Sequence, residues 1–175
     1  MNRRRAIQQQ HERAAVLGFL GWFEQRRKVA FRIIDEPNPP EAIIQSKRLT
    51  RWVEVVDAFW SKGWARDQYS FATPGEEHVS IGPGPHAGPD LTFANSFVEV
   101  LSKKLEKSSY LPVAKQYGPG YLVVNVDYPL FDRRARLKAK ELWTKGRPWP
   151  NNGCFREVFL RIRMFQGYAF QSWVV

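Results

Sequence analysis

Hydrophobic side chains follow two periods along this chain, and each period predicts a different kind of element. In the first segment Val16, Leu20 and Phe23 recur at the three-to-four-residue spacing of one helix face. Similar spacing or capping predicts helices over 3–28, 93–110 and 132–145, with a shorter helix over 64–71. Apolar runs rich in β-branched and aromatic residues predict strands over 29–34, 41–45, 51–59 and 121–127.

The C-terminal part fits both periods. Phe155, Val158 and Ile162 match a helix, whereas Leu160, Ile162 and Met164 alternate with arginines as in a strand. We favour two strands joined at Gln166-Gly167, because a paired partner would protect the aromatic and β-branched segment 168–175.

Taken in order, these elements run α-β-β-β-α-β-α-β-β, which predicts an α/β domain with a mixed central sheet and flanking helices. Segment 73–90 holds eight glycines and prolines and predicts a long loop. With 175 residues and no linker that divides the chain, we expect a single domain over 1–175.

The chain is strongly basic. The chain has 27 Lys and Arg against 17 Asp and Glu, a net charge of +10, which makes a polyanion the first partner to consider. The 7 Trp, 6 Tyr and 12 Phe offer faces on which unpaired bases can stack. One cysteine and three histidines exclude a disulfide and a Cys/His zinc site, so a metal would be held mainly by oxygen. No apolar run approaches the roughly 20 residues that cross a bilayer, and the basic start lacks a signal-peptide apolar region, so we expect a cytoplasmic protein with no membrane partner.

Two acidic residues on neighbouring predicted strands are the leading candidates for chemistry. Glu41 begins one strand, and Glu54 lies inside the next between valines. Two such carboxylates can share Mg²⁺ or Mn²⁺, which is a nuclease arrangement. The alternative is an ordinary hairpin on which both residues face solvent. Asp57, at an odd spacing from Glu54, should point to the opposite side of the sheet.

At these residues the sequence resembles the PD-(D/E)xK nuclease superfamily, which has the restriction-endonuclease-like fold. Pro40-Glu41 resembles the proline-acid motif, and Glu54-Val55-Val56 falls at the (D/E)xK motif. The resemblance implies a core over 3–127, about two-thirds of the chain, with 132–175 as a helix and β-hairpin extension. Val56 stands where the family has a lysine that orients the attacking water and stabilises charge on the phosphate.

The resemblance also implies two supporting residues. In some members the lysine has moved to the later helix, where Lys104 lies on the core-facing stripe beside Leu101. The first helix often supplies an accessory acid, and Glu24 at the edge of its buried face is the candidate metal ligand. Each has a plainer interpretation: Lys104 as a stem that extends its ammonium to water, and Glu24 as an exposed partner of Lys28.

The sequence therefore predicts a metal-dependent nuclease acting on DNA, or less favourably RNA, with Glu41, Glu54 and Lys104 catalytic. Contacts to the nucleic-acid backbone are expected from Arg26, Arg27, Lys28, Lys47, Arg48 and Arg66. The alternative is a catalytically inactive nuclease-like fold that serves as a basic module for binding nucleic acid or protein. A structural or assembly protein of a phage or mobile element is a third, and a homo-oligomer is compatible with all three.

Overall fold

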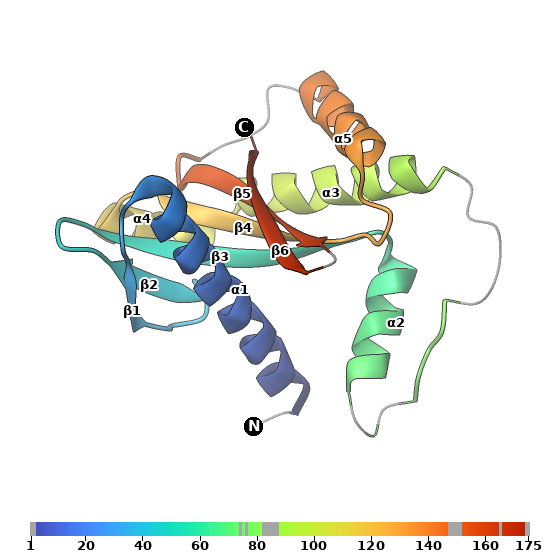
Figure 1. Cartoon of the computed structure of the whole chain (residues 1–175), viewed down its shortest axis with the longest axis horizontal. Coiled ribbons are helices and arrows are strands. Elements are labelled where there is room, and N and C mark those ends of the chain that lie inside the picture. The colour runs from blue at the N-terminus through green and yellow to red at the C-terminus, as the bar shows by residue number, and fades with distance from the viewer. Residues whose placement is uncertain are drawn as a thin grey trace.

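A single six-stranded sheet organises the protein, as the computed structural model shows for residues 3–73, 75, 77–81, 88–146, 152–164 and 166–173. The strands lie in chain order, β1-β2-β3-β4-β5-β6 (Figure 1). Their bounds are β1 Arg32–Asp35, β2 Ala42–Gln45, β3 Thr50–Phe59, β4 Gly120–Asp127, β5 Phe155–Met164 and β6 Gly167–Trp173. Strands β3, β4 and β5 are parallel, and the other neighbours are antiparallel. The predicted α/β class with a mixed sheet is confirmed.

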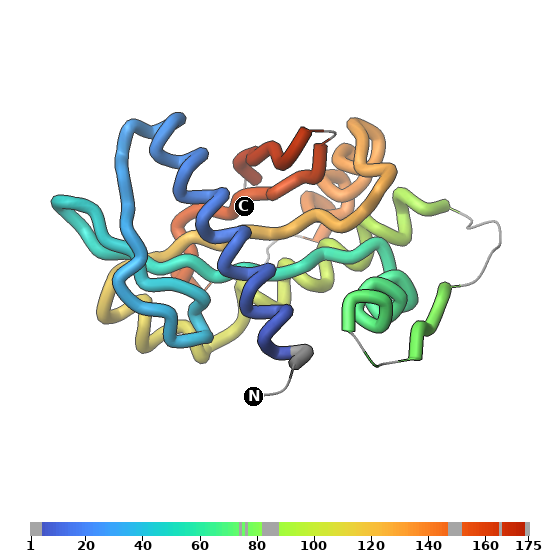
Figure 2. The backbone as a smooth tube through the Cα atoms, turned by 60° about the horizontal axis from the view of Figure 1, so that its bottom comes forward, coloured from blue at the N-terminus to red at the C-terminus, as the bar shows by residue number. Residues whose placement is uncertain are grey.

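Helices cover both faces of this sheet. Their bounds are α1 Arg3–Arg27, α2 Lys62–Ala72, α3 Pro89–Glu106, α4 Leu111–Tyr117 and α5 Arg133–Lys145, with a 3-10 turn η1 over Ser108–Tyr110. Helix α1 crosses one face diagonally, while α3 and α5 pack together on the other (Figures 1 and 2). Within the described part of the chain, no helix is both long and apolar enough to span a membrane.

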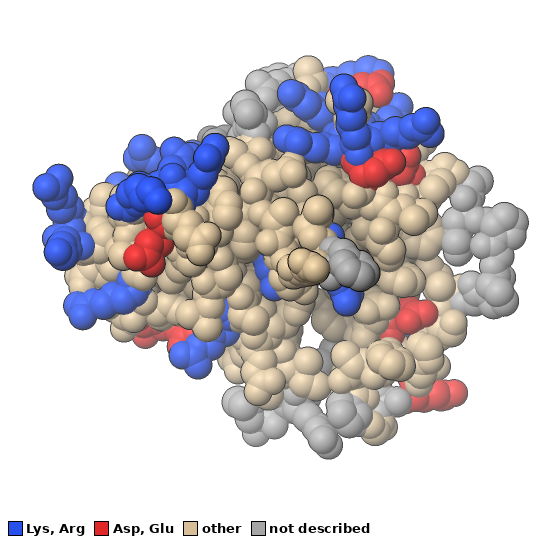
Figure 3. All heavy atoms as spheres, in the orientation of Figure 1, with Lys and Arg blue, Asp and Glu red and all other residues tan. Residues whose placement is uncertain are grey.

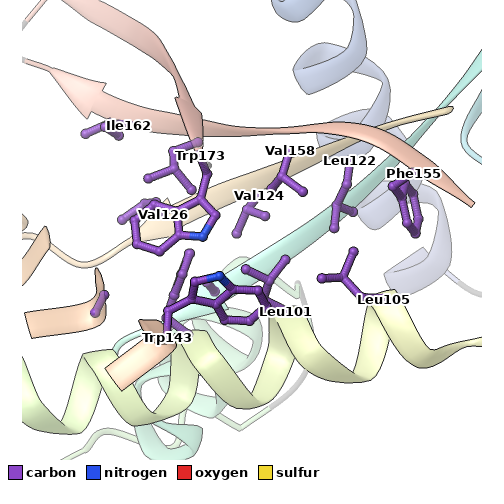
Figure 4. Close-up of a cluster of buried hydrophobic side chains, with 14 of the residues drawn as sticks. Leu101, Leu105, Leu122, Val124, Val126, Trp143, Phe155, Val158, Ile162 and Trp173 are labelled. Atoms are coloured by element: carbon purple, nitrogen blue, oxygen red, sulfur yellow. The ribbon is translucent and has the colours of Figure 1, made fainter. Parts of the chain in front are cut away.

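The larger hydrophobic core lies between the sheet and α3 with α5. Buried residues of α3 recur every four positions through Phe93, Phe97, Leu101 and Leu105, which aligns them along one face. They meet the apolar side chains of β4 and β5, and Trp143 of α5 points toward Trp173 at the end of β6 (Figure 4). This stripe fixes how α3 lies on the sheet, and with it the position of every other α3 side chain.

The second core lies under α1. Phe19 and Phe23 pack on Tyr121 of β4 and Phe159 of β5, with Phe19 and Phe159 ring centroids 5.0 Å apart. Strand β4 is therefore buried on both faces, as its continuous apolar run predicts.

Several boundaries differ from the predicted ones. The helix predicted over 93–110 ends at Glu106, and the chain then forms η1 and α4, which no periodic pattern indicated. The first strand begins at Arg32 rather than at residue 29 because it is an exposed edge, where apolar content says little about pairing. The C-terminal hairpin is confirmed, with Met164 opposite Gly167. Of the predicted loop 73–90, residues 74, 76 and 82–87 lie outside the described residues.

Candidate active site

Glu54 is a buried carboxylate in the middle of β3, with 1% of its surface exposed. Side chains of β3 alternate, so that Trp52 and Ala58 join the core under α3 while Val53 and Val55 join the core under α1. Glu54 therefore faces α3. Burial of a charged carboxylate there requires partners that replace water.

Two groups meet at one oxygen of Glu54. The Lys104 ammonium of α3 forms an ion pair with Oε1, and the Tyr110 hydroxyl donates a hydrogen bond of 2.5 Å to the same oxygen. Lys104 Nζ also donates to the Tyr110 hydroxyl at 3.2 Å. Lys104 reaches this point because it lies beside Leu101 on the buried stripe of α3, and only 22% of its side chain is exposed.

Tyr110 was not predicted as a site residue, since it lies at the end of the predicted helix with no spacing that marks it. Its ring stacks on Trp52 with centroids 5.4 Å apart, and Trp52 Nε1 donates to the carbonyl of Gly118 at 2.9 Å. A side chain at Gly120 would place its Cβ 2.3 Å from the Trp52 ring, so glycine is needed for this stack. Burial, followed by the charge of Glu54, raises the pKa of Tyr110, so its hydroxyl stays a donor.

Glu41 approaches the same point from the start of β2. The backbone N–H of Val55 donates to Glu41 Oε2 at 2.8 Å. Burial, followed by the charge of the nearby Glu54 carboxylate, raises the pKa of Glu41 to about 9. Among the described residues, the buried Oε2 of Glu54 has no hydrogen-bond partner. Two carboxyl groups from separate strands thus meet at one place, where either a proton or a cation would relieve their repulsion.

The acid that α1 contributes is Glu12, not Glu24. Glu24 is exposed and does not line the pocket that Glu41 and Glu54 share, whereas Glu12 is 9% exposed and lines this pocket. Gln8 Nε2 donates to Glu12 Oε1 at 2.8 Å, while burial raises the pKa of Glu12 and the nearby charge of Asp57 adds to that rise. The sequence does contain a signal for Glu12, because this residue lies four positions before Val16 and eight before Leu20, on the same face of the helix.

These side chains line one pocket of about 360 Å³, which includes Glu12, Glu41, Glu54, Lys104 and Lys107. In the described ranges, no group of three or more His, Cys, Asp or Glu side chains is arranged to hold a metal ion. The pair Glu41 and Glu54 still fits a hard divalent cation, because Mg²⁺ takes one or two carboxylates and completes its shell with water and substrate oxygens. The partnerless Oε2 of Glu54 is the donor such an ion would use.

Residues around the motif take the positions that alternation predicts. Val56 is partly buried and packs against the core under α3, so no cation stands at the usual lysine position. Asp57 points to the other face, where it meets His11 of α1 with 3.5 Å between Oδ1 and Nε2.

The predicted backbone-contacting residues are exposed but do not line the pocket. They are Arg26, Arg27, Lys28, Lys47, Arg48 and Arg66. Basic side chains gather near the end of α1 with the β2–β3 turn, and over α5 (Figure 3). Arg26 is 14 residues after Glu12 on α1, or roughly 20 Å at 1.5 Å per residue. The basic end of α1 is thus well separated from the acid that this helix contributes to the pocket.

No family model matches this chain, and no curated protein or solved structure was found to be similar to it.

Proposed function

We propose that this protein is a metal-dependent nuclease that hydrolyses phosphodiester bonds of DNA, with RNA as the less favoured substrate. The observation that carries the proposal is the meeting of Glu41 and Glu54 beside Lys104 in one pocket. The net charge of +10 supports a polyanionic substrate.

The order of elements also supports the proposal. Helix α1, strands β1 to β3, helix α3 and strand β4 follow the helix, three strands, helix and strand of the restriction-endonuclease-like core. Helix α2, between β3 and α3, is an addition to that order. The proposed active site lies where β2 and β3 meet α3, which is where the resemblance places the two acidic motifs and the displaced lysine.

Each residue has a defined task in this proposal. Glu41 and Glu54 would hold Mg²⁺ or Mn²⁺, which when bound polarises the scissile phosphate and lowers the pKa of water. Lys104 supplies a fixed positive charge for the developing negative charge on the phosphate oxygens. Tyr110 keeps the Glu54 carboxylate in one orientation, and Glu12 closes the α1 side of the pocket.

Two observations favour a second candidate, a nuclease-like fold that binds nucleic acid or protein without cleaving it. Val56 replaces the motif lysine, and Lys104 is already engaged by Glu54. In such a module the ion pair is a structural element of the core. Binding would then depend on salt concentration but not on divalent metal.

The experiment that separates them is a cleavage assay on supercoiled plasmid and single-stranded DNA, with Mg²⁺, Mn²⁺ or EDTA. We expect cleavage only with metal, and a loss of about 100-fold or more in Glu54→Gln, because the carboxylate is a predicted metal ligand. Glu24→Gln, which removes an exposed acid from α1, is the matched control and should cleave like the wild type.

DNA binding measured in EDTA completes the assay. Glu54→Gln should bind DNA as the wild type does, which separates lost chemistry from lost affinity. Binding without turnover in the wild type, together with no heat of Mg²⁺ or Mn²⁺ binding by calorimetry, would favour the non-catalytic module. Full cleavage by Glu54→Gln would remove Glu54 from the mechanism.

A further inference from the structure

A polar row crosses the α1 face of the sheet near the carboxyl ends of its three parallel strands. Asp57, Asn125 and Arg161 are register partners on β3, β4 and β5. Asn125 Nδ2 donates to Asp57 Oδ1 at 2.7 Å, and Arg161 Nη1 donates to Asn125 Oδ1 at 3.2 Å. The row two residues earlier is apolar and buried, and consists of Val55, Val123 and Phe159. The change from apolar to hydrogen-bonded polar residues marks the end of the hydrophobic core and the start of a polar pocket.

This row is the floor of a second pocket of about 330 Å³, here named the Arg161 pocket. Helices α1 and α2 flank this edge of the sheet (Figure 1), and His11, Arg163 and Tyr168 line the pocket beside the row. Open α/β sheets bind ligands at the carboxyl ends of their parallel strands. The Arg161 pocket adjoins the pocket of about 360 Å³ that Glu41 and Glu54 line, because Gln8, Asp57, Phe59 and Tyr69 line both.

Arg161 is the unusual residue of this pocket. It is 6% exposed, and its guanidinium carbon lies 3.4 Å from the centroid of the Tyr168 ring. Within the described ranges it forms no ion pair, and its buried Nε has no hydrogen-bond partner. An apolar residue at this position would stabilise the fold at least as well as a buried cation that lacks a counter-ion. The guanidinium is therefore best explained by an anion that the pocket receives.

The acids that line the pocket form no direct ion pair with Arg161 in the described ranges, although the charge of Asp57 acts on it across Asn125. Asp57 already accepts from Asn125 and from the Tyr69 hydroxyl at 3.1 Å, and it faces His11. Asp127 accepts from Trp64 Nε1 at 3.4 Å. Arg163 is exposed at the rim and, among the residues described, forms no ion pair. In the described ranges, neither of these two guanidinium groups is thus paired directly with a carboxylate.

We propose that the Arg161 pocket binds a nucleotide through its phosphate, which Arg161 and Arg163 hold. Guanidinium groups suit this ligand, because their planar donors match phosphate oxygens two at a time. The choice of a nucleotide rests on the proposed nuclease function. Because the two pockets adjoin, the bound unit would be the nucleotide next to the scissile phosphate, which would lie at the metal that Glu41 and Glu54 are proposed to hold.

The test measures binding in EDTA, so that catalysis plays no part. A fluorescein-labelled single-stranded 12-mer and free adenosine 5′-monophosphate are titrated into wild type, Arg163→Ala and Arg156→Ala. Arg156 is an exposed arginine on the same strand β5 at its opposite end, so both variants lose one charge. We expect Arg163→Ala to weaken 12-mer binding about tenfold, which corresponds to one lost charge-assisted contact, and Arg156→Ala to weaken it much less.

Both probes together identify the source of the phosphate. Weakening of the 12-mer alone supports a polynucleotide unit in the Arg161 pocket, and weakening of both probes supports a nucleotide site that also accepts the free monomer. Equal affinity of Arg163→Ala and Arg156→Ala for both probes would overturn the inference. Arg161→Lys, which keeps the charge but loses the planar donors, should repeat the effect of Arg163→Ala in protein with an unchanged melting temperature. Because no metal is present, failure here would leave the cleavage result for Glu54→Gln unaffected.

Discussion

The two faces of the sheet bury carboxylates in opposite ways. On the α1 face, burial raises the pKa of Asp57, but hydrogen bonds from His11, Asn125 and Tyr69 outweigh it and leave that pKa below its usual value. On the α3 face, burial and the adjacent Glu54 raise the pKa of Glu41 to about 9. Both carboxylates lie at the edges of hydrophobic cores, so burial alone does not set the direction of the shift.

The number of donors explains the difference. Asp57 has three neutral or cationic partners spread over both oxygens, whereas Glu41 accepts from the backbone N–H of Val55 and lies near the charge of Glu54. In Glu54 itself, Lys104 and Tyr110 both use Oε1. Among the described residues, the buried Oε2 of Glu54 has no hydrogen-bond partner. A carboxylate with donors on both oxygens holds its neighbours in place, whereas a pair of carboxylates that lacks a donor on one oxygen favours the binding of a cation. The contrast separates a structural acid from a candidate metal site.

The largest effect should come from removing the Lys104 cation on the α3 face. Lys104→Met keeps the length of the side chain but leaves Glu54 buried without its ion pair, so the free energy of unfolding should fall by about 3 kcal/mol in urea denaturation at pH 8. The double variant Glu54→Leu/Lys104→Met should recover most of this loss, because no charge is then stranded. A single variant as stable as the wild type would show that the ion pair between Glu54 and Lys104 does not stabilise the fold.

A smaller change, of opposite sign, should follow from Glu41→Gln. The pKa of Glu41 rises from 4.5 to about 9 on folding, so its stabilisation is complete below pH 4.5 and is lost as pH rises toward 9. In EDTA the wild type should therefore lose stability between pH 5 and 9, while the variant stays nearly constant and is the more stable of the two at pH 9 by at least about 1.4 kcal/mol, the value of a single pKa unit. Mg²⁺ should raise the melting temperature of the wild type alone. Parallel pH profiles of the two proteins would contradict the raised pKa of Glu41.

The smallest effect concerns the α1 face. The hydrogen bond to Asp57 raises the pKa of His11 above 6.5, so the stabilisation by this pair is complete below pH 6.5 and is lost as pH rises through the folded-state pKa. His11→Gln should lower stability by a few tenths of a kcal/mol at pH 5.5 and by nothing at pH 8.5, because half of the imidazole is exposed to solvent. Thermal unfolding at both pH values measures this. In an Asp57→Asn background the pH dependence should disappear.

Local patterns predict the sheet and the position of Lys104 well. The four-residue spacing of Phe93, Phe97 and Leu101 fixes which side of α3 faces the sheet, and Lys104 follows from that geometry. Alternation along β3 likewise predicts that Glu54 and Asp57 face opposite sides. The predicted start of the helix over 132–145 is marked by Asp132, whose side chain accepts from the N–H groups of Arg134 and Ala135.

Contacts between distant segments are what the sequence does not reveal. Tyr110 reaches Glu54 only because α3 ends early and the chain turns back through η1, which no hydrophobic period encodes. Glu24 and Glu12 both lie near the buried face of α1, and the choice between them depends on where the helix crosses the sheet. The Asp57, Asn125 and Arg161 row depends on the register of three strands, with 36 residues or more between partners.

Gly120 shows how far a missing side chain can act. Its bare backbone admits the Trp52 indole, Trp52 supports the ring of Tyr110, and the Tyr110 hydroxyl bonds to Glu54. A single methyl group at residue 120 would displace the indole. This displacement would pass through two aromatic rings to a carboxylate on another strand. The chemistry of an acid can thus depend on a residue that carries no functional group at all.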